Sequence, residues 1–67
     1  MDKFETGFIA EFKKLDDTID DYGNLAECIF LADDAEIRIT LDTEEHSEVK
    51  RLEPGKFYHL TIESRDE

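Results

Sequence analysis

Alternation of apolar and polar residues is clearest from Ala35 to Asp42, where every second residue is a branched aliphatic. The apolar positions are Ile37, Ile39 and Leu41. This period of two is typical of a strand with one buried face. The preceding stretch, Leu25 to Ala32, is apolar except at Glu27, which is typical of a strand inside a sheet. With Asp33-Asp34 as a turn between them, the pattern predicts a β-hairpin over residues 25–42.

After Asp42 the period changes to one that favours a short helix. Thr43 is the expected N-cap, with Val49 and Leu52 facing inward and Pro54-Gly55 ending the helix. A last strand is expected to follow up to Glu63. Its two faces alternate: Tyr58, Leu60 and Ile62 lie on one, and Phe57, His59, Thr61 and Glu63 lie on the other. Residues 64–67 are expected to form a solvated, flexible tail.

The N-terminal third fits two periods. A helical stripe runs through Phe4, Phe8, Phe12, Leu15 and Ile19. The segment from Thr6 to Phe12 also alternates as a strand, and Gly7 would cost a helix interior about 1 kcal/mol. We favour the strand. The expected fold is mainly β, a small open barrel or curled antiparallel sheet with one short helix; the alternative is an α+β fold with a helix from Asp2 to Asp20 on a three-stranded sheet.

Three segments together carry a family resemblance. They are Gly7–Phe12 as a bent first strand, Ala32–Leu41 as a hairpin, and the Leu-x-Pro-Gly-x stretch of Leu52–Tyr58. The order of these segments resembles the OB-fold, in the form found in replication protein A. The resemblance implies a barrel that binds single-stranded nucleic acid on exposed aromatic residues beside basic ones. The chain departs from it because nothing after Glu63 supplies a fifth strand, which leaves an open edge able to pair with a second copy or a partner.

Charge changes this picture most. The 67 residues include 19 acidic and 8 basic side chains, a net charge of −11, while 39% of the residues are hydrophobic. The hydrophobic content predicts a folded single domain over residues 1–67, and the charge predicts repulsion of phosphate backbones and attraction to basic surfaces. Direct binding to nucleic acid is therefore not expected.

Candidate chemistry is sparse. Cys28 has apolar neighbours and no visible base, His46 and His59 lie on different elements, and no phosphate-binding or zinc motif occurs. In the acidic stretch from Asp16, Asp21 stands where a calcium-binding EF-hand loop needs glycine. We expect no enzymatic activity, cofactor or metal. A single cysteine, the absence of a signal-peptide pattern and the short apolar runs favour a cytoplasmic location away from membranes.

These observations predict a small acidic module that binds a basic surface of another protein. Its sharpest form is an inhibitor that mimics nucleic acid, and in size and charge the chain is similar to the short inhibitor proteins of phages and plasmids. The carboxylates expected to take part are Asp16, Asp17, Asp20, Asp21, Asp33, Asp34, Glu36, Asp42, Glu44, Glu45 and Glu48. The alternatives are a single-strand binder that uses Phe57, Tyr58 and Arg38, or a structural accessory subunit.

Overall fold

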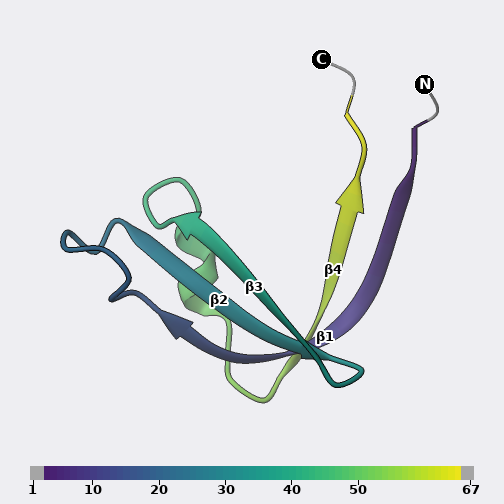
Figure 1. Ribbon diagram of the computed structural model, residues 1–67, viewed down its shortest axis with the longest axis horizontal. Coiled ribbons are helices and arrows are strands. Elements are labelled where there is room, and N and C mark those ends of the chain that lie inside the picture. Colours follow the sequence, from purple (N-terminus) through teal and green to yellow (C-terminus); the bar gives the residue numbers. More distant parts are fainter. Residues whose placement is uncertain (1–2, 66–67) are drawn as a thin grey trace.

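The first strand of the chain pairs with two partners and so sets the shape of the molecule. In the computed structural model, which describes residues 3–65, β1 runs over Glu5–Asp16. Its first part pairs antiparallel with β4 (Phe57–Glu63), and its second part pairs antiparallel with β2 (Leu25–Ala32). The register shifts between Phe12 and Lys14, where the pairing passes from one partner to the other. Such bulges bend a strand, and β1 turns there from one arm of the sheet into the other (Figure 1).

The third strand completes a single open sheet. β3 (Ala35–Asp42) pairs antiparallel with β2 along its whole length, which gives the strand order β3-β2-β1-β4. β3 and β4 are therefore the edges, and Figure 1 shows them diverging from the bend. The prediction of a mainly β fold with an open antiparallel sheet is confirmed. The alternative N-terminal helix is wrong, because residues 5–16 form a strand in which Ala10 and Phe12 are buried and Phe8 is partly buried on the same face.

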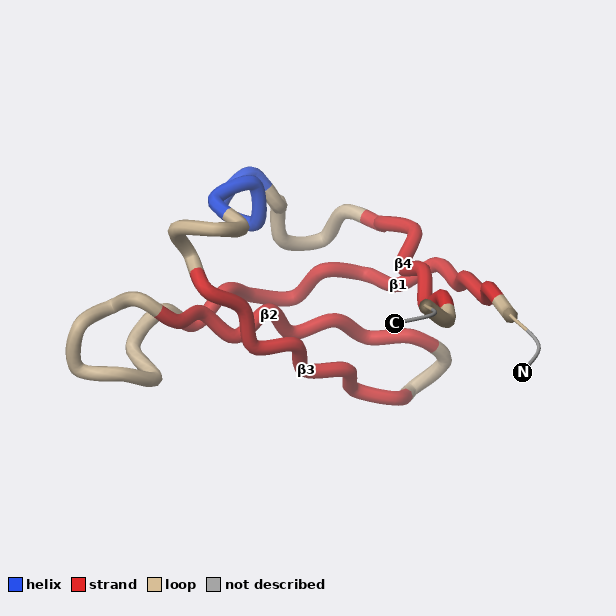
Figure 2. The backbone as a smooth tube through the Cα atoms, turned by 90° about the horizontal axis from the view of Figure 1, so that it is seen from above, coloured by secondary structure: helices blue, strands red, loops and turns tan. Residues whose placement is uncertain are grey.

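The predicted helix after β3 is shorter and of another kind. It is a single 3-10 helix, η1 (Ser47–Arg51), and it lies above the sheet in Figure 2. Thr43 does not cap it: His46 is the residue before η1, and the Thr43 hydroxyl donates to the carbonyl of Asn24 at 3.2 Å. The Asp42 carboxylate accepts hydrogen bonds from the N–H groups of Glu44 and Glu45 instead, and this turn delays the helix.

The core lies on one face of the sheet. Its fully buried cluster is Ala10, Phe12, Cys28 and Phe30, with the rings of Phe12 and Phe30 edge to face at 5.4 Å. The inner side chains of β3 and β4 pack around this cluster but stay partly exposed, as do Val49 and Leu52 from the η1 region. A core this small is consistent with the modest burial that a chain of this size reaches.

Short contacts fix the two ends of the sheet. Asp33 and Asp34 make a two-residue hairpin turn in which both residues have positive φ, 48° and 67°. At the other end of the chain, Ser64 N–H donates to the carbonyl of Phe4 at 2.8 Å, and Phe4 N–H donates to Ser64 Oγ at 2.7 Å. The pairing of β1 with β4 thus extends to Ser64, while residues 66 and 67 of the expected tail lie outside the described residues.

Candidate partner-binding surface

Two acidic segments meet at one end of the sheet. The loop between β1 and β2 and the segment between β3 and η1 lie at the same end in both views (Figures 1 and 2). Thr43 joins them: its N–H donates to Asn24 O, and its hydroxyl lies 3.2 Å from Asn24 O and 3.4 Å from Gly23 O. Thr43 is 8% exposed, so this bridge is shielded from water.

We call these two segments, residues 16–24 and 42–48, the acidic end. Their carboxylates are Asp16, Asp17, Asp20, Asp21, Asp42, Glu44, Glu45 and Glu48, and neither segment contains lysine or arginine. Leu25 lies between the two segments, because its N–H donates to Asp20 Oδ1 at 3.4 Å and its Cα pairs with that of Asp42. Carboxylates from two segments that are distant in the sequence thereby lie at one end of the sheet.

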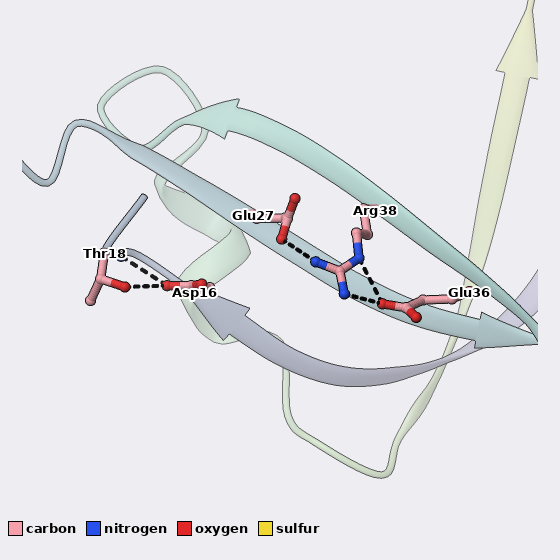
Figure 3. Close-up of polar contacts among 5 residues, drawn as sticks. All are labelled: Asp16, Thr18, Glu27, Glu36 and Arg38. Atoms are coloured by element: carbon pink, nitrogen blue, oxygen red, sulfur yellow. Dashed lines mark hydrogen bonds and ion pairs between the residues drawn. The ribbon is translucent and has the colours of Figure 1, made fainter. Parts of the chain in front are cut away.

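The carboxylate of Asp16, the first in the acidic end, is hydrogen-bonded within its own loop. Asp16 Oδ1 accepts hydrogen bonds from Thr18 Oγ1 at 2.6 Å and from Thr18 N–H at 3.0 Å (Figure 3). These bonds favour the ionised form and lower the pKa of Asp16 below its usual value. The negative charge at this position is therefore maintained to lower pH than at an ordinary aspartate.

Arg38 neutralises carboxylates on the outer face of β2 and β3. Its guanidinium pairs with Glu27 Oε1 at 2.9 Å and with Glu36 Oε1 at 2.7 Å (Figure 3). The two carboxylates raise the pKa of Arg38, with Glu36 the larger cause. Other ion pairs join Lys13 to Glu11, Lys56 to Glu53 and Arg65 to Glu63. Several basic side chains thus lie beside acids of their own chain, and none of these pairs involves the acidic end.

The carboxylates expected from the sequence do not all share one surface. Asp33 and Asp34 occupy the β2–β3 turn, at the opposite end of the hairpin from the acidic end (Figure 1). Glu36 follows that turn and is bound by Arg38. The acidic end therefore contains the loop carboxylates of the expected set, while these three lie elsewhere.

The two aromatic residues proposed for single-strand binding point to opposite faces. Phe57 is 67% exposed on the outer face. Tyr58 packs on the core with its ring edge to face with Phe12, and its hydroxyl accepts a hydrogen bond from Glu53 N–H at 2.9 Å. The neighbouring Lys56 ammonium is 3.1 Å from the Glu53 carboxylate. A surface for stacking nucleic-acid bases would thus offer only the exposed ring of Phe57, beside Lys56, which is already paired with Glu53.

The remaining candidate groups have structural surroundings. Cys28 is 1% exposed, and burial raises the pKa of its thiol. The His59 ring lies against Gly7 on the neighbouring strand, in space that a Cβ at Gly7 would need. Over residues 3–65, no three histidine, cysteine or carboxylate side chains gather as a metal site, and no helix is long and apolar enough to cross a membrane.

Sequence reasoning missed an apolar groove of about 270 Å³ on the inner face. Its floor includes Cys28 and Phe30 of β2, and its sides are the inner residues of β3 and β4 together with the η1 region. Alternation identified these side chains as inward-facing. It could not show that these side chains remain partly exposed beside Val49 and Leu52.

Comparison of the chain with protein-family models, curated proteins and solved structures gives no match.

Proposed function

We propose that this protein is a small acidic binding module that occupies a basic surface of a nucleic-acid-binding protein or enzyme, acting there as a nucleic-acid mimic and inhibitor. The observation that carries the proposal is the acidic end, with eight carboxylates on two bridged loops and no lysine or arginine among them. Such a surface attracts basic proteins at long range and disfavours acidic ones.

The distribution of ion pairs supports this assignment. Lys13, Lys56 and Arg65 pair with carboxylates outside the acidic end, and Arg38 pairs with Glu27 and Glu36, although its charge also favours the ionised form of Asp16. Binding to phosphates would instead require cations that release counterions. The net charge of −11 opposes that mode, and the acidic end presents charge of the same sign as a phosphate backbone.

The test compares two variants that each lose three negative charges. One neutralises the acidic end (Asp17→Asn, Asp21→Asn, Glu44→Gln), and the control neutralises the same residue types elsewhere (Asp33→Asn, Asp34→Asn, Glu5→Gln). All of these side chains are exposed. With about 0.5 kcal/mol for each exposed charge pair, the first variant should bind a basic partner about tenfold more weakly. The control should change affinity much less.

The partner is recovered on immobilised protein at low salt, eluted at high salt and purified for titration. Affinity should fall as salt rises, and DNA or RNA should compete for the same partner. Equal weakening by the two variants would show that only net charge matters, and binding indifferent to salt would overturn the proposal. A gel shift of single-stranded nucleic acid by the protein alone, lost in Phe57→Ala, would favour the single-strand-binding alternative.

A further inference from the structure

The apolar groove lies between strands whose outer edges are unpaired. Its lining comes from Ile39 and Leu41 of β3 and from Tyr58 and Leu60 of β4, over Phe30 of β2. Among residues 3–65, backbone hydrogen bonds link β3 only to β2 and β4 only to β1 within the sheet. Figure 1 shows no segment of chain between the two edges. Inner side chains here remain partly exposed, and Ile62 is 54% exposed.

We propose that the free edge of β3 takes up an extended segment of the basic partner, which adds a strand to the sheet and places its apolar side chains in the groove. The proposal deepens the proposed function and rests on it. At about 270 Å³ the groove is below the ~300–1,000 Å³ usual for small-molecule sites, and it runs beside a strand edge. Strand addition uses both features, since backbone bonds supply affinity and alternate side chains fill pockets.

The turn fixes which groups of β3 face the open edge. In a two-residue hairpin the flanking residues, Ala32 and Ala35, form the first hydrogen-bonded pair. Bonded and non-bonded pairs then alternate, so Glu36, Arg38 and Thr40 direct their N–H and C=O groups away from β2. The same argument, starting from the Ser64 N–H to Phe4 O bond, directs the N–H of Thr61 to the open edge of β4.

Charge selects a basic segment over a second copy of this chain. On the outer face of β3, Glu36 is already paired with Arg38, whereas Asp42 begins the acidic end. A strand added at this edge has its outward side chains beside Asp42 and the carboxylates that follow it. Lysine or arginine there is favourable, whereas two copies would bring two charges of −11 together. Neither edge strand has the proline or inward-pointing charge that usually blocks such pairing.

Three synthetic peptides of about seven residues, a common strand length, test the proposal with the intact protein. The first alternates lysine and valine, the second has the same composition in blocks, and the third repeats the first with every backbone amide methylated. The alternating peptide should bind at least tenfold more tightly than the other two. It should also slow amide exchange at Thr40. Methylation removes the donors of the peptide without changing the protein.

Two matched proline variants locate the edge. Thr40→Pro removes a donor from the open edge of β3, and Thr61→Pro does the same on β4; both residues are exposed. Circular dichroism checks that each variant folds. Thr40→Pro should weaken binding of the alternating peptide at least tenfold, and Thr61→Pro less than threefold.

Several results would overturn the edge proposal. They are equal binding of the alternating and block peptides, equal binding after methylation, protection at Thr61 in place of Thr40, or a dimer of the protein alone that protects Thr40. Equal binding of the first two peptides would leave the proposed function intact, since attraction by charge alone would explain it. The proposed function fails separately, when neutralising the acidic end leaves affinity for the basic partner unchanged.

Discussion

Replacing Asp34 with glycine should make this acidic protein more stable. Asp33 and Asp34 form the β2–β3 turn with φ of 48° and 67°. Two-residue hairpin turns with positive φ at both positions favour glycine at the second. Asp34 is exposed, and its backbone conformation is the reason to expect an effect.

The magnitude follows from two opposing terms. Left-handed backbone costs an L-residue about 1–2 kcal/mol, which glycine avoids. Glycine also gives the unfolded chain more freedom, which costs about 0.4–1 kcal/mol. The net gain is about 0.5–1 kcal/mol, or an increase in Tm of about 2–8 °C for a domain of this size. Less repulsion from Asp33 acts in the same direction.

Thermal and urea unfolding of a series at this position separate backbone from charge. Asp34→Asn removes the charge but keeps a side chain that tolerates left-handed backbone, and Asp34→Ala removes the charge and tolerates it poorly. The expected order of stability is Gly above Asn, Asn at or above Asp, and Ala lowest. Alanine as stabilising as glycine would refute the backbone argument, and asparagine equal to glycine would assign the gain to charge.

Three further outcomes are expected. Gly7→Ala should change stability by less than about 1 kcal/mol, because His59 Cε1, 2.9 Å from the new Cβ, ends an exposed side chain that can rotate away; a larger loss in urea unfolding that His59→Ala does not relieve would contradict this. Thr18→Ala should raise the pKa of Asp16 towards its usual value in an NMR titration, and an unchanged pKa would contradict the hydrogen bonds. In the wild type, the lowered pKa of Asp16 stabilises the fold above the usual pKa of aspartate, and this stabilisation is lost as pH falls. The variant should therefore lose less stability than the wild type between about pH 5 and 3. The Cys28 thiol should react far more slowly in the native protein than after unfolding, and similar rates in the two states would show that Cys28 is not in the core. Because burial raises the pKa of this thiol in the folded protein, the free energy of unfolding should fall as pH rises above about 8.5.

The β3 strand could be predicted because its burial is one-sided. Ile37 and Ile39 face the core and Arg38 faces solvent, so period and environment agree. The segment of β1 was ambiguous because Phe8 and Phe12 satisfy both a helical and a strand period. Pairing with β4 decides between them, and residues about fifty positions apart in the chain supply it.

Long-range contacts also explain what the sequence did not reveal. Thr43 has the right type and position for a helix cap, but the backbone of Asn24 binds it instead. The pairing of Arg38 with Glu27 crosses from β3 to β2, so local spacing did not show which carboxylates remain unneutralised. Each acidic loop could be recognised from the sequence. That the two loops meet at one end of the sheet, and that a groove lies between the edge strands, follows from the strand order.

Net charge and open edges are physically connected in this fold. Within residues 3–65, β3 and β4 have unpaired edges with apolar inner faces, an arrangement that ordinarily promotes pairing between copies. Proline and lysine are absent from both strands, so apart from Glu36 and Arg38 on β3 the protection comes from repulsion between chains of charge −11. The negative charge repels a second copy of the chain but attracts a basic strand. The negative net charge can therefore keep the sheet edges of two copies apart and attract a basic partner to the same edges. Both effects require an ionic strength at which charge is incompletely screened.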